Sequence, residues 1–415
     1  MPGAPLTLDQ IVENGLCIGC GLCRSIAKPG HVDLVMTPEG RERPVARRPL
    51  DEATLERINA VCPGTRLGGE SPASSGGDHD TVWGSARRLS IGYARDPQVR
   101  YRGSSGGVLT ALGQFLLASG RAKFILHAGA TRSAPMRSER RLSFDCAAVL
   151  EGAGSRYGPA AVLVDFTEIL DRAEPFALIA KPCDVNAVRN LARLDPRVDR
   201  YLRYVMTLVC GGASDLKKSE EVLERFHVRE SEVALFRYRG HGNPGLTRIE
   251  TRDGRAFELT YRQLWEDEST WMIQPRCRIC PDAVGLEADI AASDTWPGGS
   301  PAGEDEGFNG LIVRTPRGLE LYEAAVAAGA LTIERAVTFA DFDRWQPHQV
   351  RKRRAVWARL RGRELAGKPA PLVTNLGLEE CARQNSWREN LAECRGARER
   401  ATEGGLLEPP ARPAP

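Results

Sequence analysis

Two groups of four cysteines are the residues in this chain whose spacing could do chemistry. The first group is Cys17, Cys20 and Cys23 at two-residue spacing, with a distant Cys62 that Pro63 follows. Four thiolates can hold a [4Fe–4S] centre, one sulfur to each iron, and a triplet at this spacing lets one tight loop reach three irons. The spacing therefore predicts an iron–sulfur centre near the N-terminus.

The second group is less regular, because it combines Cys183 and Cys210 with the pair Cys277 and Cys280. The two lone cysteines could instead be buried small apolar residues, as free cysteines often are. Zinc also takes four thiolates, although a zinc ribbon would use two such pairs. From spacing alone, a second centre and a buried-cysteine interpretation both stay open.

Disulfides are the least favoured use of these thiols. Residues Met1–Leu16 show neither a basic start nor an apolar core, so no secretory signal is visible and a reducing compartment is expected. Three further cysteines, Cys146, Cys381 and Cys394, need no function. We therefore expect a cytoplasmic protein.

Composition is that of an ordinary globular protein of two or three domains. The chain has 415 residues and a net charge of +3, which gives no indication of a nucleic-acid partner. Apolar runs such as Phe124–Leu126 are too short to span a bilayer, so no membrane span is expected.

Four regions follow from the patterning of the chain. Residues 1–66 are predicted to form a cysteine-bearing module, and 67–82, rich in Gly and Ser, a linker. Residues 83–330 are predicted to form an α/β core, and 331–415 a helical region with a disordered tail over Glu408–Pro415.

Short apolar strands alternate with amphipathic helices in the core, which predicts an α/β fold with a mixed sheet. Asp253-Gly254 between β-branched residues predicts a hairpin over Arg248–Leu259. The predicted strands are Ala122–Ala128, Phe176–Ala180, Tyr204–Val209, Val233–Tyr238 and Gly310–Arg314, and the predicted helices are Val185–Leu194, Asp215–Phe226 and Pro316–Gly329.

A Ser/Gly turn, Ser104-Ser105-Gly106-Gly107, precedes a predicted helix. Backbone N–H groups and the helix dipole at such a turn favour an anion, and glycines let a phosphate approach closely. The alternative is a serine that caps the helix. Beside an iron–sulfur signature the phosphate interpretation gains weight, because a flavin dinucleotide carries a pyrophosphate and can convert single electrons into a two-electron transfer.

Two further segments carry polar groups suited to a ligand. Arg237 and Arg239 lie in a glycine-rich loop, and their guanidinium groups match phosphate or carboxylate geometry. Asp294 lies shortly after Cys280 and could hydrogen-bond a flavin. A solvated turn and a turn cap are the respective alternatives.

In their order along the chain, these segments resemble the family of beta subunits of coenzyme F420 (deazaflavin) hydrogenases and dehydrogenases, which includes 7-hydroxymethyl chlorophyll a reductase. The matching stretches are CIGCGLC, GSSGGVLTAL, KPCD, CGG, CRICPD, ADI and SDTW, between Cys17 and Arg314. The resemblance implies an α/β flavoprotein core with a ferredoxin-like iron–sulfur module, FAD and one or two [4Fe–4S] clusters. It also implies that Ser104, Ser105, Gly106, Gly107 and Thr110 contact FAD, and that Cys183, Cys210, Cys277 and Cys280 bind one cluster.

Lys181 departs from the family pattern, since many members have Gly-Thr where this chain has Ala180-Lys181. A cation at this position could stabilise a reduced, anionic flavin, or donate a proton if burial lowers its pKa. Lys181 is therefore the predicted catalytic residue.

The sequence predicts an iron–sulfur flavoprotein oxidoreductase. Electrons would pass from ferredoxin or a partner subunit through the clusters and FAD to a small organic acceptor. One alternative is an accessory electron-transfer subunit of a deazaflavin-reducing complex, and another is a zinc-stabilised module without enzymatic activity. The basic stretch Arg351–Arg354, with Arg359, Arg361 and Arg363, could attract an acidic ferredoxin or could be a solvated helix face.

Replacing Cys20 with alanine should leave one iron without its thiolate. We expect Cys20→Ala to lose about four irons per chain, the content of one such cluster, and to keep FAD, because the flavin is predicted to lie in another region. Iron analysis and an absorption spectrum of the purified variant check this, and unchanged iron content would contradict the assignment of the first group.

Overall fold

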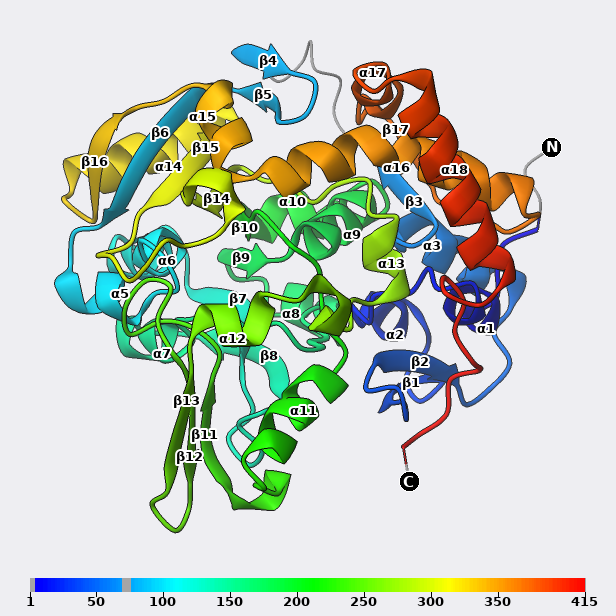
Figure 1. The fold of residues 1–415 in the computed structure, drawn as a ribbon, viewed down its shortest axis with the longest axis horizontal. Helices are drawn as coiled ribbons and strands as arrows, with labels where there is room; N and C mark the ends of the chain where they lie inside the picture. The colour runs from blue at the N-terminus through cyan, green and yellow to red at the C-terminus, as the bar shows by residue number, and fades with distance from the viewer. Residues whose placement is uncertain (1–3, 69–75, 415) are drawn as a thin grey trace.

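An eight-stranded mixed sheet forms the centre of the molecule (Figure 1). The computed structural model describes residues 4–68 and 76–414. The strand order is β16-β6-β15-β14-β10-β9-β7-β8, in which β7, β9, β10 and β14 are parallel and the other pairs are antiparallel. The strands are β6 Arg88–Ala94, β7 Phe124–Ala130, β8 Ser138–Ser143, β9 Phe176–Ala180, β10 Leu202–Leu208, β14 Ile290–Asp294, β15 Asn309–Val313 and β16 Leu331–Ala336.

The predicted mixed α/β core is confirmed, with small shifts at strand ends. Strand β9 has the predicted bounds, whereas β7 begins two residues later than predicted. The N–H of Ala122 donates to the carbonyl of Leu116, so Ala122 belongs to the turn that precedes the strand.

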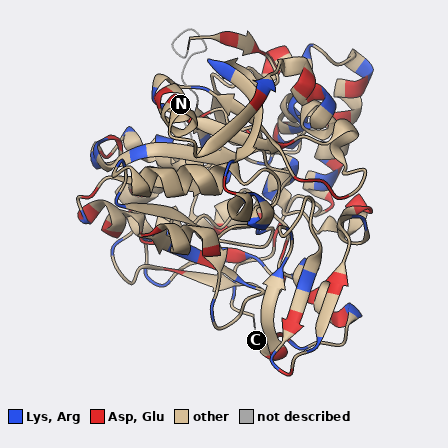
Figure 2. Cartoon of the chain, turned by 90° about the vertical axis from the view of Figure 1, so that its left-hand side faces the viewer, with Lys and Arg blue, Asp and Glu red and all other residues tan. Residues whose placement is uncertain are grey.

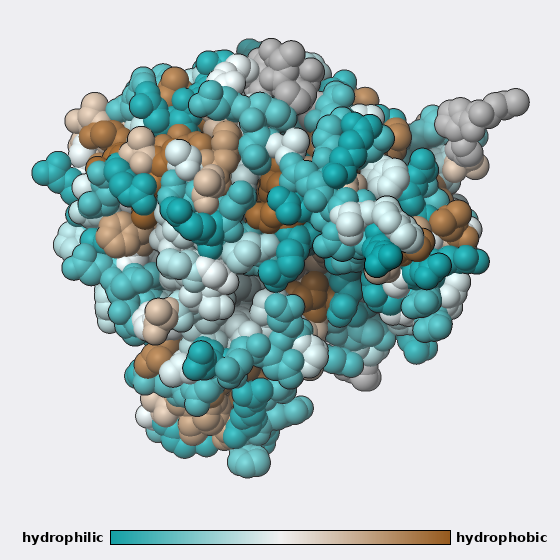
Figure 3. Space-filling model, turned by 45° about the horizontal axis from the view of Figure 1, so that its top comes forward, coloured by the Kyte–Doolittle hydropathy of each residue, from teal (hydrophilic) through white to brown (hydrophobic). Residues whose placement is uncertain are grey.

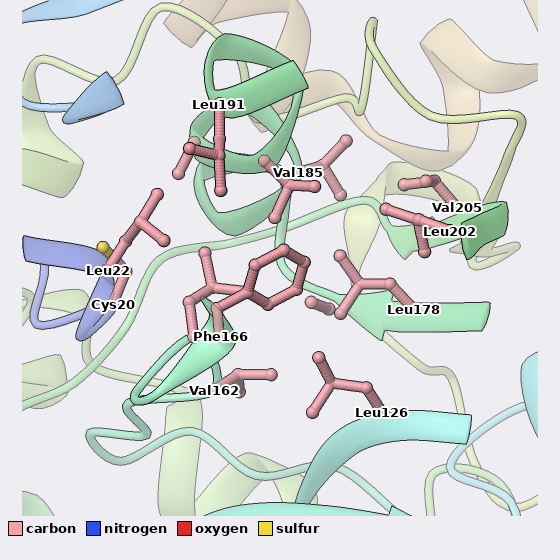
Figure 4. Packing of buried hydrophobic residues seen from close by; sticks show 14 of the residues in the cluster. Cys20, Leu22, Leu126, Val162, Phe166, Leu178, Val185, Leu191, Leu202 and Val205 are labelled. Carbon is pink, nitrogen blue, oxygen red and sulfur yellow. The ribbon is translucent and has the colours of Figure 1, made fainter. Parts of the chain in front are cut away.

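Alternating side chains of the strands enter two cores on opposite faces of the sheet. On β7, Phe124 and Leu126 enter one core and Ile125 enters the other. Figure 4 shows the first core, where Leu126, Leu178 and Phe166 converge. Helices that contribute to the first core include α8 Phe166–Asp171, α9 Pro182–Ala192 and α10 Arg197–Tyr201, together with Leu22, Val61 and Cys277 from other helices. Those of the second core are α5 Pro97–Arg102, α6 Val108–Ala118, α7 Cys146–Glu151 and α14 Pro316–Ala327.

A smaller three-stranded sheet projects from the core, at the bottom of Figure 1. It contains the predicted hairpin, and Arg248 pairs across it with Glu258 at 2.6 Å. Lysine and arginine are interspersed with acidic residues in the view of Figure 2, as expected from the small net charge. The elements of this part are α11 Lys217–Arg225, η1 Glu230–Glu232, β11 Val233–Arg237, β12 Thr247–Thr251, β13 Ala256–Leu259, α12 Tyr261–Trp265 and η2 Glu268–Trp271.

The N-terminal module shares its hydrophobic core with the C-terminal helices. Leu8 and Ile58 of the module lie in one buried cluster with Val356 and Leu360, and β17 pairs in parallel with β3. The module consists of α1 Leu8–Glu13, α2 Leu22–Ile26, β1 Val32–Met36, β2 Glu42–Ala46, α3 Glu52–Val61 and β3 Arg66–Gly68. The C-terminal elements are α15 Phe339–Trp345, α16 Pro347–Leu365, β17 Leu372–Thr374, α17 Leu378–Ala382 and α18 Trp387–Thr402.

The structure describes only part of the predicted linker. Residues 69–75 lie outside the described residues, whereas β4 (Asp78–Asp80) pairs with β5 (Gly84–Ala86), and Trp83 is fully buried. Trp83 packs against Phe342 at 5.4 Å between ring centroids. The last part of the expected linker is therefore structured and belongs to the core.

The expectation of a disordered tail does not hold at its start. Glu408 is buried and accepts two hydrogen bonds from the fully buried Arg43, at 2.8 and 2.9 Å. The N–H of Ala414 donates to the carbonyl of Met36. Arg43 needs a carboxylate because a buried unpaired guanidinium is costly, and the sequence does not show that the C-terminus supplies it.

None of the described helices is long and apolar enough to cross a membrane. The face in Figure 3 is mostly hydrophilic, with small scattered hydrophobic patches.

Candidate functional site

The four cysteines of the first group line one small pocket within the N-terminal module. The loop that carries the triplet turns at Gly19 and Gly21, whose φ values of 69° and 88° favour glycine. The N–H of Gly19 donates to Cys17 Sγ at 3.3 Å, and the N–H of Gly64 donates to Cys62 Sγ at 3.3 Å. These donors favour charged sulfur.

Burial is the main electrostatic constraint on this group. It raises the pKa of the Cys17 thiol to about 11, although Arg43 opposes the shift. Burial also raises the pKa of Cys20, Cys23 and Cys62. Buried thiolates therefore need cations, amide donors or bound metal.

The second group also comes together from three separate segments. Cys183 begins α9, Cys210 follows β10, and Cys277 lies in α13 (Pro275–Arg278). Their charges interact, since Cys280 and Cys210 both affect the pKa of Cys183. Burial raises the pKa of Cys210 to about 12 and also raises that of Cys277, while Lys352 opposes both shifts. The N–H of Ala213 donates to Cys277 Sγ at 3.3 Å.

Within the described parts of the chain, no three His, Cys, Asp or Glu side chains are arranged to hold a single metal ion. The eight cysteines as ligands of iron–sulfur clusters therefore stay a prediction.

A cavity of about 610 Å³ lies at the C-terminal ends of the parallel strands. Ala180, Leu208 and Asp294, the last residues of β9, β10 and β14, all line it. This edge is where α/β proteins usually bind cofactors. The predicted site residues that line it are Ser104, Ser105, Gly107, Thr110, Lys181, Arg239, Asp294 and, from the second cysteine group, Cys210.

The Ser/Gly turn is not a serine cap. Gly107, in the left-handed conformation, is the N-cap of α6 and has no capping side chain, and the first helical N–H, that of Val108, donates to Asn309 Oδ1 at 3.2 Å. Ser105 Oγ donates instead to the carbonyl of Phe308 at 2.6 Å, and Ser104 Oγ accepts from Ser155. The capping alternative is therefore wrong, and Leu109 and Thr110 in the first turn line the cavity.

Gly106 and Arg237 are not among the residues that line the cavity. A Cβ on Gly106 would lie 2.8 Å from the Asn309 nitrogen and 2.9 Å from the Gly92 carbonyl oxygen, so this glycine is needed for packing on β6 and β15. Arg237 is half-buried on β11, where burial and Arg248 lower its pKa.

Arg239 and Asp294 form an ion pair at the cavity wall. The guanidinium donates to both carboxylate oxygens, at 3.0 and 3.1 Å, and also to the carbonyl of Ser104. It lies 4.5 Å above the Trp296 ring. Burial would lower the pKa of Arg239, but Asp294 outweighs it and raises the pKa. Arg239 therefore fixes the Ser/Gly turn to β14.

Lys181 and Asp184 form a second pair at the wall. Lys181 Nζ donates to the two carboxylate oxygens at 2.9 and 2.7 Å and to the carbonyl of Ala160 at 3.3 Å. Burial would lower the pKa of Lys181, but Asp184 and Cys183 raise it above its ordinary value. A proton-donor role through a lowered pKa is therefore not supported, whereas a fixed positive charge is.

No pattern in the sequence indicated the aromatic wall of the cavity. Tyr157, Tyr261, Trp265 and Trp296 line it from loops and from α12. Ser214 Oγ, Trp265 Nε1 and Trp296 Nε1 are buried without a hydrogen-bond partner. Unpaired buried donors in a cavity wall fit a polar ligand, because such groups are costly when left unpaired.

Two arginines of the predicted basic stretch are used inside the molecule. Arg353 and Arg363 are buried and donate to backbone carbonyls, while Arg359 pairs with Glu393 at 2.8 Å. Arg351 is exposed and lines the cavity, and Lys352 lies near the second cysteine group. The stretch is therefore not one solvated face.

Two family models match this chain, and both describe the beta subunit of coenzyme F420 hydrogenase/dehydrogenase. The model of its N-terminal part matches residues 90–164, and the model of its C-terminal part matches residues 173–338. The chain belongs to this family. The predicted resemblance is confirmed, and the matched residues include the Ser/Gly turn, the Lys181 pair and the second cysteine group.

Curated relatives are distant. The chain is 26% identical over 245 residues to the beta subunit of the F420-dependent formate dehydrogenase 1 of Methanococcus maripaludis, covering 57% of this chain and 58% of the relative. It is 22% identical over 347 residues to the coenzyme F420-dependent sulfite reductase of Methanocaldococcus jannaschii, covering 79% of this chain and 48% of the relative. It is 20% identical over 323 residues to one of the subunits of the F420H2 dehydrogenase of Methanosarcina mazei, covering 77% and 85%. The chain thus spans about half of the first two relatives.

The fold is similar to a chain of the F420-reducing [NiFe] hydrogenase complex from Methanosarcina barkeri. The TM-score is 0.50 at 20% identity, over 67% of this chain and 95% of that chain. This likeness supports the mixed α/β fold.

Proposed function

We propose that this chain is an electron-transfer oxidoreductase subunit that holds FAD in the cavity and a [4Fe–4S] cluster at each cysteine group. The observation that carries the proposal is the cavity itself, because the Ser/Gly turn, Lys181 and Cys210 line it together. A flavin would exchange two electrons with an organic partner molecule, and clusters take them one at a time.

The residues present fit both groups. In the first turn of α6 the Val108 N–H is used by Asn309, whereas Leu109 and Thr110 line the cavity and offer N–H groups for a pyrophosphate. The unpaired Ser214, Trp265 and Trp296 offer donors for polar atoms. Each cysteine group combines four thiols with amide donors to sulfur. The family relatives, named for formate dehydrogenase, sulfite reductase and F420H2 dehydrogenase, support redox chemistry of this class.

Anaerobic purification followed by an absorption spectrum and iron analysis tests the proposal. Flavin peaks with a broad iron–sulfur shoulder, and about eight irons per chain, are expected for two four-iron clusters. A colourless protein with stoichiometric zinc would support the zinc-stabilised module instead.

The Lys181 charge should raise the flavin midpoint potential, because it stabilises the reduced anion. We therefore expect Lys181→Met to lower that potential. The change should correspond to about 1 kcal/mol of electrostatic free energy, the size expected for one partly screened charge. The fully buried Asp184 would then be unpaired, so the double variant Lys181→Met with Asp184→Asn is the matched control and should recover part of the shift. A redox titration with unchanged potential in the single variant would remove Lys181 from the site.

An acidic electron carrier, such as ferredoxin, would dock over the second cysteine group. Arg278 is exposed beside Cys277, and neither Arg278 nor Lys352 forms an ion pair with any described residue. Burial is the first cause that lowers the pKa of the nearby Arg400; Arg359 and Arg278 also lower it, whereas Glu393 and Glu399 raise it. The exposed positive charge here is therefore that of Arg278. An acidic partner would be attracted by this charge.

Charge reversal of Arg278 should slow reduction by an acidic ferredoxin. We expect Arg278→Glu to lower the association rate about tenfold at low ionic strength, with a smaller effect at high salt. Stopped-flow mixing measures the rate. The exposed Arg48 of the N-terminal module provides the control Arg48→Glu, and a larger effect there would place docking at the first group instead.

A further inference from the structure

Glu42 lines a small surface pocket that shares one wall residue, Pro159, with the large cavity. It is the first residue of β2, and its backbone packs against Gly19 of the first cysteine loop, since a Cβ there would be 2.5 Å from the Glu42 carbonyl oxygen. The nearby backbone N–H of Ala161 lowers the pKa of its carboxyl group, while its Oε2 atom is buried without a partner. The sequence offers no reason to expect an acid here.

A short backbone segment, residues 159–161, separates the two spaces. Glu42, Arg137 and Pro159 line a pocket of about 200 Å³, and Pro159 and Ala160 also line the large cavity. The carbonyl of Ala160 accepts from Lys181 Nζ on the cavity side, and the N–H of the next residue, Ala161, lies near enough to Glu42 to lower its pKa. The lysine and the glutamate therefore reach adjacent peptides of the same wall.

The charged groups around Glu42 shift its pKa in opposite directions. Burial raises the pKa of Glu42 from 4.5 to about 7, and Asp184 adds to this shift. Lys181 and Arg43 oppose it, and Arg137 lies close enough to interact. The carboxyl group can thus gain or lose a proton near neutral pH.

On the proposed function, electron exchange between an organic molecule and the clusters needs such a group in either direction. When ferredoxin reduces the protein, a proton must enter the cavity, and when an organic molecule donates a hydride, a proton must leave it. A hydride from an organic donor carries two electrons and one proton. The cysteine-bound clusters pass on the two electrons only, so one proton remains for each hydride. It must leave the cavity by another route.

We propose that Glu42 is the group through which this proton passes to solvent. The Glu42 carboxylate accepts the proton and becomes a carboxylic acid. It then releases the proton to water in the 200 Å³ pocket, which restores the carboxylate. Electrons leave through the clusters to the partner protein, so charge and atoms balance.

Glu42→Gln keeps the shape of the side chain and removes its exchangeable carboxyl proton. The dithionite-reduced, desalted protein is mixed with ferricyanide and a pH indicator in weak buffer, and proton release is followed by stopped flow. We expect release to slow at least about tenfold, within the range for loss of a positioned acid–base group. Glu42→Asp should restore part of the rate. Glu39→Gln, in the turn before β2, is the matched control and should behave like the unchanged protein.

A second measurement does not depend on turnover. Since the pKa of Glu42 is raised in the folded state, its stabilising contribution is complete below pH 4.5 and is lost as the pH rises to about 7. Between pH 4.5 and about 7, the unfolding equilibrium constant of the unchanged protein should therefore rise more than about tenfold relative to that of Glu42→Gln. One unit of pKa corresponds to a factor of ten. Urea unfolding at several pH values measures it.

The outcomes separate this proposal from the proposed function. Protein without flavin and iron would overturn both. Protein with flavin and iron, in which Glu42→Gln leaves proton release unchanged, would overturn the role of Glu42 alone, even if the pH dependence of unfolding shows that the acid is buried.

Discussion

The buried ion pair between Lys181 and Asp184 is the interaction on which the site depends. It lies where β9 ends and α9 begins, and it fixes the first turn of α9, which carries Cys183. Asp184 is fully buried, so it needs the lysine ammonium, and the lysine in turn holds the carbonyl of Ala160. One pair thereby connects the cavity wall, the second cysteine group and the segment next to Glu42.

Several cations lie close to the buried sulfurs of both cysteine groups. Arg43 lies near Cys17, and Lys352 lies near Cys210 and Cys277. Arg276 is buried and lowers the pKa of both Cys62 and Cys277, while it donates to the carbonyl of Pro63 at 2.7 Å. The two cysteine groups are therefore joined by a shared positive charge, which favours anionic centres at both positions.

The N- and C-terminal regions act as one unit around the first cysteine group. Leu406 and Glu408 of the C-terminal segment pack against Gly15 and Arg43, and Val356 of α16 joins the same core. In Figure 4, Cys20 and Leu22 also point into the core under the main sheet. The geometry of the cysteine loop thus depends on segments far away in the sequence.

The sequence alone predicted which cysteines come together and several of the local elements. Thiol spacing grouped Cys17, Cys20, Cys23 and Cys62, which line one pocket, and apolar alternation predicted β9 with its observed bounds, because both signals are local. Only the tertiary structure placed Lys181, Arg239 and Thr110 around one cavity, left Gly106 and Arg237 out of it, and paired Arg43 with Glu408. These contacts join residues that are tens to hundreds of positions apart. Burial shifts the pKa of Glu42 and decides which charges pair, and it is a property of the packed fold rather than of any local pattern.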